Sequence, residues 1–158
     1  EDFFVQRCQH PIEVMRMIRY ERQPGSPEPL EGQQRMGAHT DYGNVTLLAT
    51  DGVAGLQVRR RDGGWIDMPA LPDALVCNIG DCLMRWSNDL YLSTPHRVGT
   101  PPRLRHSIAF FLDPNPDALV SVDMGGGLVT AETCAQAIEL AEALTAGGYE
   151  TKVAGAQL

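Results

Sequence analysis

The sequence predicts an all-β core built from short strands arranged as a sandwich or a barrel. Short apolar and β-branched segments recur between Val14 and Leu112, and turn signals such as Asp51-Gly52 and Asp62-Gly63-Gly64 separate them. Several short strands with regularly spaced turns are typical of sandwiches and barrels rather than of helical folds. A double-sheet jelly roll is one such solution, and it encloses a pocket between its sheets.

The first elements expected are a helix end, a strand and a loop. Residues 1–11 indicate the end of a helix, because their apolar start is followed by Pro11, which stops a helix. Val14–Tyr20 alternates in part and predicts a strand. Residues 21–37 are rich in proline and glycine and predict a loop that leads to His39.

Further strands are expected after this loop, because each segment is apolar, β-branched or alternating and ends at a turn signal or a proline. The predicted strands span residues 45–50, 56–58, 65–68, 74–79, 82–86, 94–98 and 105–112. Pro114 and Pro116 close the last of them.

The pattern changes after Gly125-Gly126-Gly127. Thr130 can cap a helix whose apolar residues recur at helical spacing, and Gly147-Gly148 would end it. We therefore expect a β-domain over residues 1–120 and a helical extension over residues 121–158, so that helices flank the β-core at both ends.

Composition indicates one globular domain and argues against a nucleic-acid partner. The chain has 158 residues, of which 43% are hydrophobic, and its net charge is -7. Arg59-Arg60-Arg61 precedes a turn signal, so we interpret it as a solvated hairpin tip.

The sequence also bears on the cellular setting. No apolar run is long enough to span a membrane, no signal-peptide pattern is recognisable, and the four cysteines form no C-x-x-C pair. We expect a monomeric cytoplasmic protein with reduced thiols and no membrane partner. The first residues, Glu1-Asp2, suggest the inside of a longer protein, although processing would explain them equally well.

A possible metal site is formed by His39-Thr40-Asp41 together with His96. Residues i and i+2 of an extended segment point to one face, so His39 and Asp41 would point together and Thr40 away from them. Two imidazoles and one carboxylate are the ligands of a non-haem Fe(II) site with open positions. The alternative is that these are ordinary surface or core histidines, because short motifs occur by chance.

A second group of polar residues lies on the last predicted strand. Arg105, Ser107, Phe111 and Asp113 share one face by the period of two. If this strand lines a pocket, Arg105 and Ser107 would bind a carboxylate, since an arginine pairs with it through two hydrogen bonds. A 2-oxo acid chelating iron needs such a cation for its far carboxylate. The alternative is an exposed strand edge with a solvated arginine.

These residues resemble the C-terminal catalytic portion of the isopenicillin N synthase-like family of Fe(II)/2-oxoglutarate-dependent oxygenases. The similarity runs from about Phe3 to Pro114. It rests on Ala38-His39-Thr40-Asp41-Tyr42-Gly43, Gly55-Leu56-Gln57-Val58, Trp65, Asn78-Ile79-Gly80-Asp81, Ser93-Thr94-Pro95-His96-Arg97-Val98 and Arg105-His106-Ser107-Ile108.

The resemblance implies a double-stranded β-helix, which is a jelly roll, with Fe(II) bound by His39, Asp41 and His96. It implies that Arg105 and Ser107 bind the distal carboxylate of 2-oxoglutarate. Tyr20 matches a tyrosine that often assists them, although Ile18 replaces the usual Asn, and a plain core tyrosine is the alternative.

The resemblance also bears on the substrate. Phe111, Asp113 and Tyr42 correspond to positions near the primary substrate, with ordinary packing as the alternative. The implied activity is the O₂-dependent oxidation of a C–H bond of a small molecule, by hydroxylation, desaturation or ring closure, with release of succinate and CO₂.

Two other functions stay open at this point. The first is isopenicillin N synthase-type chemistry, which uses the same iron ligands without 2-oxoglutarate. The second is a truncated, non-catalytic binding module, because the long N-terminal portion of the family is absent from this sequence.

Overall fold

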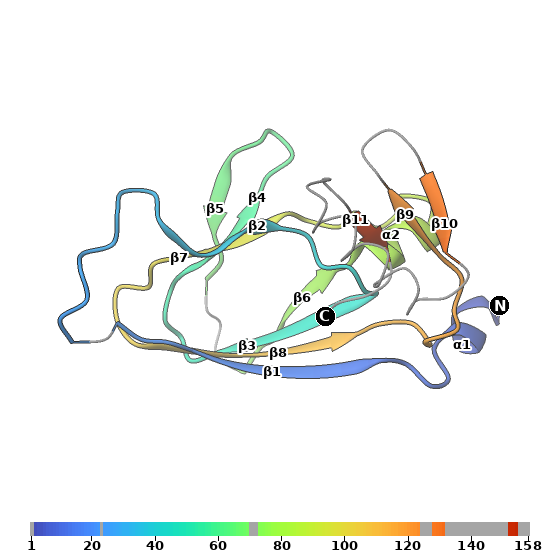
Figure 1. Cartoon of the computed structure of the whole chain (residues 1–158), viewed down its shortest axis with the longest axis horizontal. Coiled ribbons are helices and arrows are strands. Elements are labelled where there is room, and N and C mark those ends of the chain that lie inside the picture. The colour runs from blue at the N-terminus through green and yellow to red at the C-terminus, as the bar shows by residue number, and fades with distance from the viewer. Residues whose placement is uncertain (1, 23, 70–72, 124–127, 132–151, 155–158) are drawn as a thin grey trace.

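Two four-stranded antiparallel sheets form the main part of the fold. The computed structural model describes every residue except 1, 23, 70–72, 124–127, 132–151 and 155–158 (Figure 1). One sheet has the strand order β1-β8-β3-β6, and the other has the order β2-β7-β4-β5. The described residues are therefore mostly β, as the sequence predicts.

The bounds of the elements follow the sequence pattern closely. The first sheet contains β1 (Glu13–Tyr20), β8 (Arg105–Leu112), β3 (Val45–Thr50) and β6 (Val76–Ile79). The second contains β2 (Gln34–His39), β7 (His96–Gly99), β4 (Leu56–Arg59) and β5 (Trp65–Asp67). Two short helices, α1 (Phe3–Arg7) and α2 (Asp81–Trp86), accompany them within the described residues.

The two sheets face each other across the molecule. In Figure 1, β1, β8 and β3 run along one side, while β2 and β7 run along the other. Burial alternates along β8, where Arg105, Ser107, Ala109 and Phe111 are buried and the residues between them are more exposed. Period-two alternation therefore places one face of β8 toward the interior, as predicted.

The prediction was wrong for residues 82–86, which form helix α2 rather than a strand. The helix begins after Gly80, whose extended backbone serves as the N-cap, and Asp81 lies in its first turn. An acidic residue there interacts favourably with the helix dipole, and leucine, methionine and arginine are good helix formers. These local signals favour a helix over the strand that the apolar pattern predicted.

Two further boundaries differ from expectation. β2 begins at Gln34, inside the segment predicted as a loop, and pairs with β7. Thr130, predicted to cap a helix, lies in strand β10 (Leu128–Ala131). β10, β9 (Val120–Asp123) and β11 (Lys152–Ala154) form a small antiparallel sheet in the order β10-β9-β11. The rest of the predicted helix lies outside the described residues.

The β4–β5 hairpin carries the arginine run as predicted. Arg60 N donates to Gly64 O at 2.7 Å, which closes the turn, and Arg60 and Arg61 are exposed. No helix in the described part of the chain has the length and apolarity needed to cross a bilayer. The monomeric state and the cytoplasmic location stay predictions.

The segment after β2 packs directly on the start of α2. Asp81 N donates to Asp41 O at 2.7 Å, and Gly80 N donates to Asn44 O at 3.0 Å. A Cβ atom built on Gly80 would collide with the backbone carbonyl of Gly43. A glycine is therefore required at position 80 by close backbone approach rather than by its backbone angles.

We predict that Gly80→Ala destabilises the fold by about 1 to 3 kcal/mol, because the added methyl group meets backbone atoms that cannot move aside. Gly37→Ala is the matched control, since a Cβ at Gly37 has no atom within 4 Å. Urea denaturation of both variants measures the free energy of unfolding. Equal stability of the two variants would contradict the close packing at Gly80.

Candidate active site

Strand pairing brings the two predicted imidazole ligands together. β2 and β7 are antiparallel, and their register places His39 opposite His96. The two ring centroids lie 4.3 Å apart. The register of the pair shifts between Met36 and His39, which indicates a bulge beside the site.

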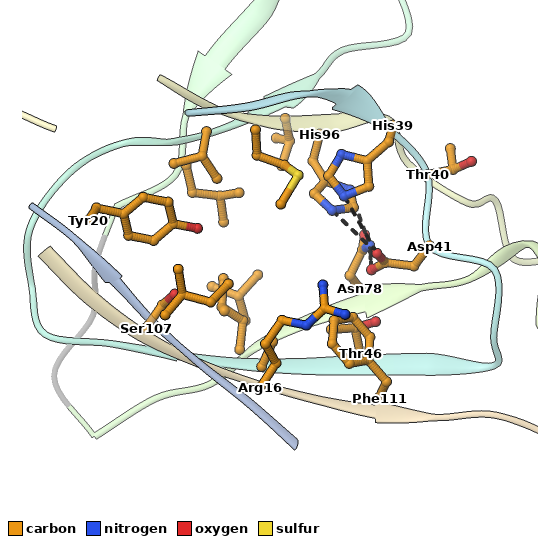
Figure 2. A pocket seen from close by; sticks show the side chains of 18 of the residues that line it. Arg16, Tyr20, His39, Thr40, Asp41, Thr46, Asn78, His96, Ser107 and Phe111 are labelled. Atoms are coloured by element: carbon orange, nitrogen blue, oxygen red, sulfur yellow. Dashed lines mark hydrogen bonds and ion pairs between the residues drawn. The ribbon is translucent and has the colours of Figure 1, made fainter. Parts of the chain in front are cut away.

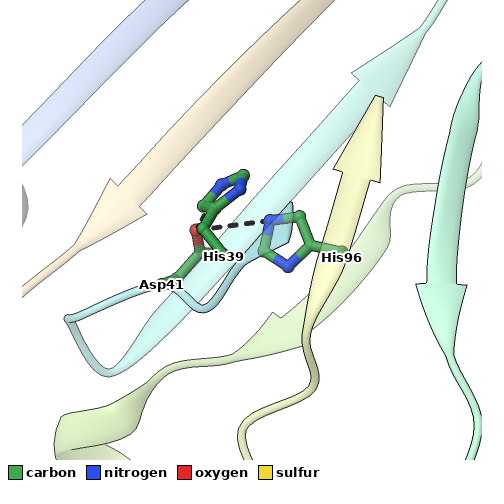
Figure 3. A group of neighbouring side chains, drawn as sticks. All are labelled: His39, Asp41 and His96. Atoms are coloured by element: carbon green, nitrogen blue, oxygen red, sulfur yellow. Dashed lines mark ion pairs between the residues drawn. The ribbon is translucent and has the colours of Figure 1, made fainter. Parts of the chain in front are cut away.

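Asp41 joins the two histidines from the segment that follows β2. Its Oδ1 atom lies 3.9 Å from His39 Nε2 and 3.5 Å from His96 Nε2 (Figure 3). Two ligands of one ion about 2 Å from each of them can lie at most about 4 Å apart, so both separations suit a shared ion. Asp41 is only 3% exposed, so an ion here would meet a largely desolvated carboxylate.

The hydrogen bonds of the His39 and His96 rings leave their Nε2 atoms available to bind a metal ion. His39 Nδ1 lies 2.8 Å from Gly37 O, and His96 Nδ1 lies 3.1 Å from Thr94 O. A carbonyl oxygen only accepts, so each Nδ1 carries a proton, and in the neutral ring each Nε2 then presents a lone pair. Both Nε2 atoms face Asp41, which is the arrangement that metal ligation requires.

Burial favours the metal-binding form of His96. Its pKa is lowered by desolvation, which outweighs the opposing effect of the Asp41 carboxylate. A histidine must be neutral to bind a metal ion, so the lowered pKa keeps His96 ready to bind at neutral pH.

Polar neighbours orient the carboxylate and the segment that carries it. Asn78, on β6, donates from Nδ2 to Asp41 Oδ2 at 2.6 Å, which leaves Oδ1 directed at the histidines. The same amide nitrogen lies 3.4 Å from His96 Nδ1, but both atoms are donors in the tautomer described above. Thr40 turns away, as predicted, and donates to Asp81 Oδ2 at 2.9 Å.

A cavity of about 370 Å³ lies between the two sheets and contains this group of ligands (Figure 2). Its wall is mostly apolar. The apolar lining consists of Ile18, Met36, Leu48, Leu56, Val58, Val76, Val98, Ala109 and Phe111. Such a wall excludes water from any ligand that the polar residues orient.

Arg105 lies in the same cavity and is 1% exposed. Its Nε atom donates to Val53 O at 3.2 Å, and its guanidinium lies 4.9 Å from the centre of the Tyr20 ring. The Nη1 atom is buried and has no hydrogen-bond partner among the described residues. A buried donor without a partner is costly, so this atom fits an anionic ligand that would complete it.

The other predicted site residues divide into two groups. Ser107, Tyr20, Phe111 and Tyr42 line the cavity, as expected. Asp113 does not belong to the lining, and its carboxylate packs against the position where Gly43 would carry a Cβ. Asp113 directly follows the last residue of β8, Leu112, and its contact with the substrate stays a prediction.

Sequence reasoning missed one charged residue of the lining, Arg16. This side chain enters the cavity from β1, on the same face as Ile18 and Tyr20. The alternation that places Tyr20 inward also places Arg16 inward, so the signal was present in the period of two.

Comparisons with known proteins agree with this geometry. The sequence profile of the 2OG-Fe(II) oxygenase superfamily matches residues 11–114. The chain is 45% identical over 112 residues to a homoarginine-6-hydroxylase of Oryza sativa subsp. japonica, which covers 70% of this chain and 34% of that protein. It is 43% identical over 119 residues to a 2-oxoglutarate-Fe(II) type oxidoreductase of Emericella nidulans, with coverage of 74% and 34%.

Solved structures give the same result. A full-length Neurospora crassa protein, crystallised in complex with alpha-KG and 5-formyluracil, is similar at a TM-score of 0.66 and 36% identity, over 75% of this chain and 40% of that chain. The matched region spans about a third of the length of the two curated relatives.

We predict that Asn78→Ala weakens the affinity for Mn²⁺, used as a redox-stable probe ion, by about 10- to 100-fold. Loss of a hydrogen bond that orients a ligand typically has an effect of this size. Titration of the protein with Mn²⁺, followed by electron paramagnetic resonance of the free ion, measures the affinity. Asn115→Ala is the control, because Asn115 is a buried asparagine that bonds to His10 and Gln6 and does not line the cavity. Unchanged Mn²⁺ affinity in Asn78→Ala would contradict the orienting role of Asn78.

Proposed function

Because this chain belongs to the 2OG-Fe(II) oxygenase superfamily, we propose that it is the catalytic core of an oxygenase that uses Fe(II) and 2-oxoglutarate to oxidise a C–H bond of a small organic molecule. One observation carries the proposal. The same cavity contains a group of two histidines and one aspartate, and also a buried arginine whose Nη1 donor has no hydrogen-bond partner among the described residues.

The two four-stranded sheets are the two faces of a double-stranded β-helix in this proposal. Their antiparallel pairing, the cavity between them and the similarity to the Neurospora crassa structure support this assignment. Residues 1–120 would make up the oxygenase domain, and residues 121–158 would be an extension of it.

His39, Asp41 and His96 would hold the iron. Their ligand atoms all lie within 4.8 Å of one another, and the donor set of two imidazoles and one carboxylate suits Fe(II). Bound there, Fe(II) would supply the activation of O₂, because three protein ligands leave coordination positions open. The neutral histidines and the anchored carboxylate would fix its position against the cavity wall.

Arg105 would bind the distal carboxylate of 2-oxoglutarate, with help from neighbouring hydroxyl groups. Its unpartnered Nη1 donor supports this role, and so does its burial, since a charge-assisted hydrogen bond is stronger where the side chain is shielded from solvent. Ser107 lies two residues further along β8 on the same face, and Tyr20 lies opposite Arg105 in the β1–β8 register. The apolar wall between this end and the metal ligands would hold the co-substrate in one orientation.

Phe111 and Tyr42 would contact the primary substrate. Both line the cavity near the metal ligands, since Tyr42 follows Asp41 directly and Phe111 pairs with Thr46 in the β3–β8 register. Aromatic side chains offer a large apolar contact at low entropic cost.

We predict that the chain forms succinate only when Fe(II), 2-oxoglutarate and O₂ are all present, because the co-substrate must be decarboxylated at the metal. Succinate is measured by mass spectrometry after anaerobic loading and exposure to air. Asp41→Ala should reduce its formation to background, whereas Asp117→Ala, which changes an exposed aspartate, should not.

Two further measurements distinguish the alternative functions. O₂ uptake without 2-oxoglutarate would favour isopenicillin N synthase-type chemistry. Absence of the charge-transfer absorption of Fe(II) with 2-oxoglutarate under anaerobic conditions would favour a non-catalytic binding module.

We predict that Arg105→Ala weakens 2-oxoglutarate binding by about 10- to 100-fold, the equivalent of roughly 1.5–3 kcal/mol for a hydrogen bond to a charged group. Its Mn²⁺ affinity should stay within about twofold, because Arg105 contacts none of the three ligands. Calorimetric titration of the Mn²⁺-loaded protein with 2-oxoglutarate measures the effect. Arg103→Ala, which changes an exposed arginine nearby, is the control. Unchanged co-substrate affinity would refute the role of Arg105.

A further inference from the structure

The cavity contains a second arginine that the proposed function leaves without a role. Arg16 lies in the middle of β1, and its side chain lines the cavity together with Ile18 and Tyr20 of the same strand. Among the described lining residues, the formally charged side chains are Arg16, Asp41 and Arg105, apart from the histidines. In the proposed function, Asp41 is a metal ligand and Arg105 binds the co-substrate.

The strand register separates the two arginines along the cavity. Tyr20 pairs with Arg105, whereas Arg16 pairs with Ala109. Four residues of a strand span about 13 Å, so Arg16 starts from a backbone position well away from the end where Arg105 lies. One ligand of the size of 2-oxoglutarate, held at Arg105 and at the metal, does not need Arg16.

The surroundings of Arg16 lie at the metal end of the cavity. Its guanidinium carbon lies 6.0 Å from the centre of the Phe111 ring. Phe111 pairs with Thr46 and Thr46 pairs with Asn78, which holds Asp41. Figure 2 shows the guanidinium of Arg16 between Phe111 and Thr46 on one side and Asn78 and Asp41 on the other.

The charge of the loaded site favours an anion at Arg16. The positive charges of Fe(II) and Arg105 together balance the negative charges of Asp41 and of the two carboxylates of 2-oxoglutarate. Arg16 is a second cationic side chain in the lining of this cavity, whose wall is mostly apolar. Charges interact more strongly where apolar walls displace water, so a substrate that brings one negative charge is favoured over a neutral one.

Access to Arg16 suits an incoming ligand. The residue as a whole is exposed although its side chain lines the cavity, so it reaches inward from the solvent-facing end. Arg105, by contrast, is 1% exposed. A ligand entering the loaded site would therefore meet Arg16 rather than Arg105.

We propose that Arg16 binds a carboxylate of the primary substrate, so that the substrates of this enzyme are small carboxylic acids. The proposal rests on the function proposed above, because it assigns the substrate of that same site. The guanidinium would pair with the carboxylate through two parallel hydrogen bonds, and the Phe111 ring would pack against the apolar part of the acid. A C–H bond beyond the carboxylate would then lie over the metal.

Matched pairs of acids and amides test this proposal in the absence of turnover. The protein is loaded with Mn²⁺ and 2-oxoglutarate, and each pair is titrated calorimetrically: hexanoate and hexanamide, cyclohexanecarboxylate and its amide, and phenylacetate and phenylacetamide. The amide keeps the shape of the acid and removes its charge. We expect at least one acid to bind about 10- to 100-fold more tightly than its amide, as a charge-assisted hydrogen bond requires.

Substitutions at position 16 test whether the preference for the acid over its amide depends on Arg16. Arg16→Gln should remove the difference between acid and amide, and Arg16→Lys should keep part of it, because lysine retains the charge without the planar fork. Arg19→Gln is the matched control, since Arg19 lies on the same strand, pairs with Glu21 on the exposed side and does not line the cavity. It should leave the preference unchanged. Thermal unfolding of each variant checks that the fold is intact.

Equal affinity for acid and amide in every pair, including no measurable binding of either, would overturn the role of Arg16. A preference for acids that persists in Arg16→Gln would overturn it as well. The underlying function fails differently, because the unmodified protein would then show no charge-transfer absorption with Fe(II) and 2-oxoglutarate.

Discussion

The site depends on the pairing of β2 with β7. This pairing sets His39 directly opposite His96, although the two residues lie far apart in the chain. A shift of one residue in either strand would turn one imidazole to the other face of the sheet, because side chains alternate along a strand. The third ligand is held by a separate contact, the packing of the Asp41–Asn44 segment on Gly80 and Asp81. Strand register and one tight backbone approach therefore define the group of proposed metal ligands.

The two sheets contribute different chemistry to the cavity. The β2–β7 sheet provides both imidazoles, which need only carbonyl acceptors behind them to present their Nε2 atoms. The β1–β8 sheet provides both arginines, Arg105 from the start of β8 and Arg16 from the middle of β1. An anionic ligand held on one wall would in this way be directed toward the proposed metal ligands of the other wall. The apolar side chains between the arginines contribute shape and exclude water, since they offer no polar partner.

Much of this could be predicted from the sequence, because the residues concerned obey the period of two. His39 and Asp41 share a face by that rule, as do Arg105 and Ser107, and the structure places all four in one cavity. Helix α2 was missed despite its local signals, since a short apolar run is ambiguous and the helix start is also set by backbone hydrogen bonds that Asp81 and Cys82 donate to the carbonyls of the distant residues Asp41 and Tyr42. The position of Asn78 against Asp41 depends on tertiary packing in the same way.

Arg16 was missed for a different reason, and this reason agrees with the role proposed for it. On β1, Met15 and Met17 are 65% and 78% exposed, whereas Arg16 between them lines the cavity. The usual rule places apolar residues inward and charged residues outward; Ile18 and Tyr20 follow it, whereas Arg16 and the two methionines do not. A strand that turns its arginine toward an apolar cavity and its methionines outward gains nothing from burial by doing so. Such an inversion is expected where a residue serves a ligand rather than the fold, because local sequence rules fail at functional sites.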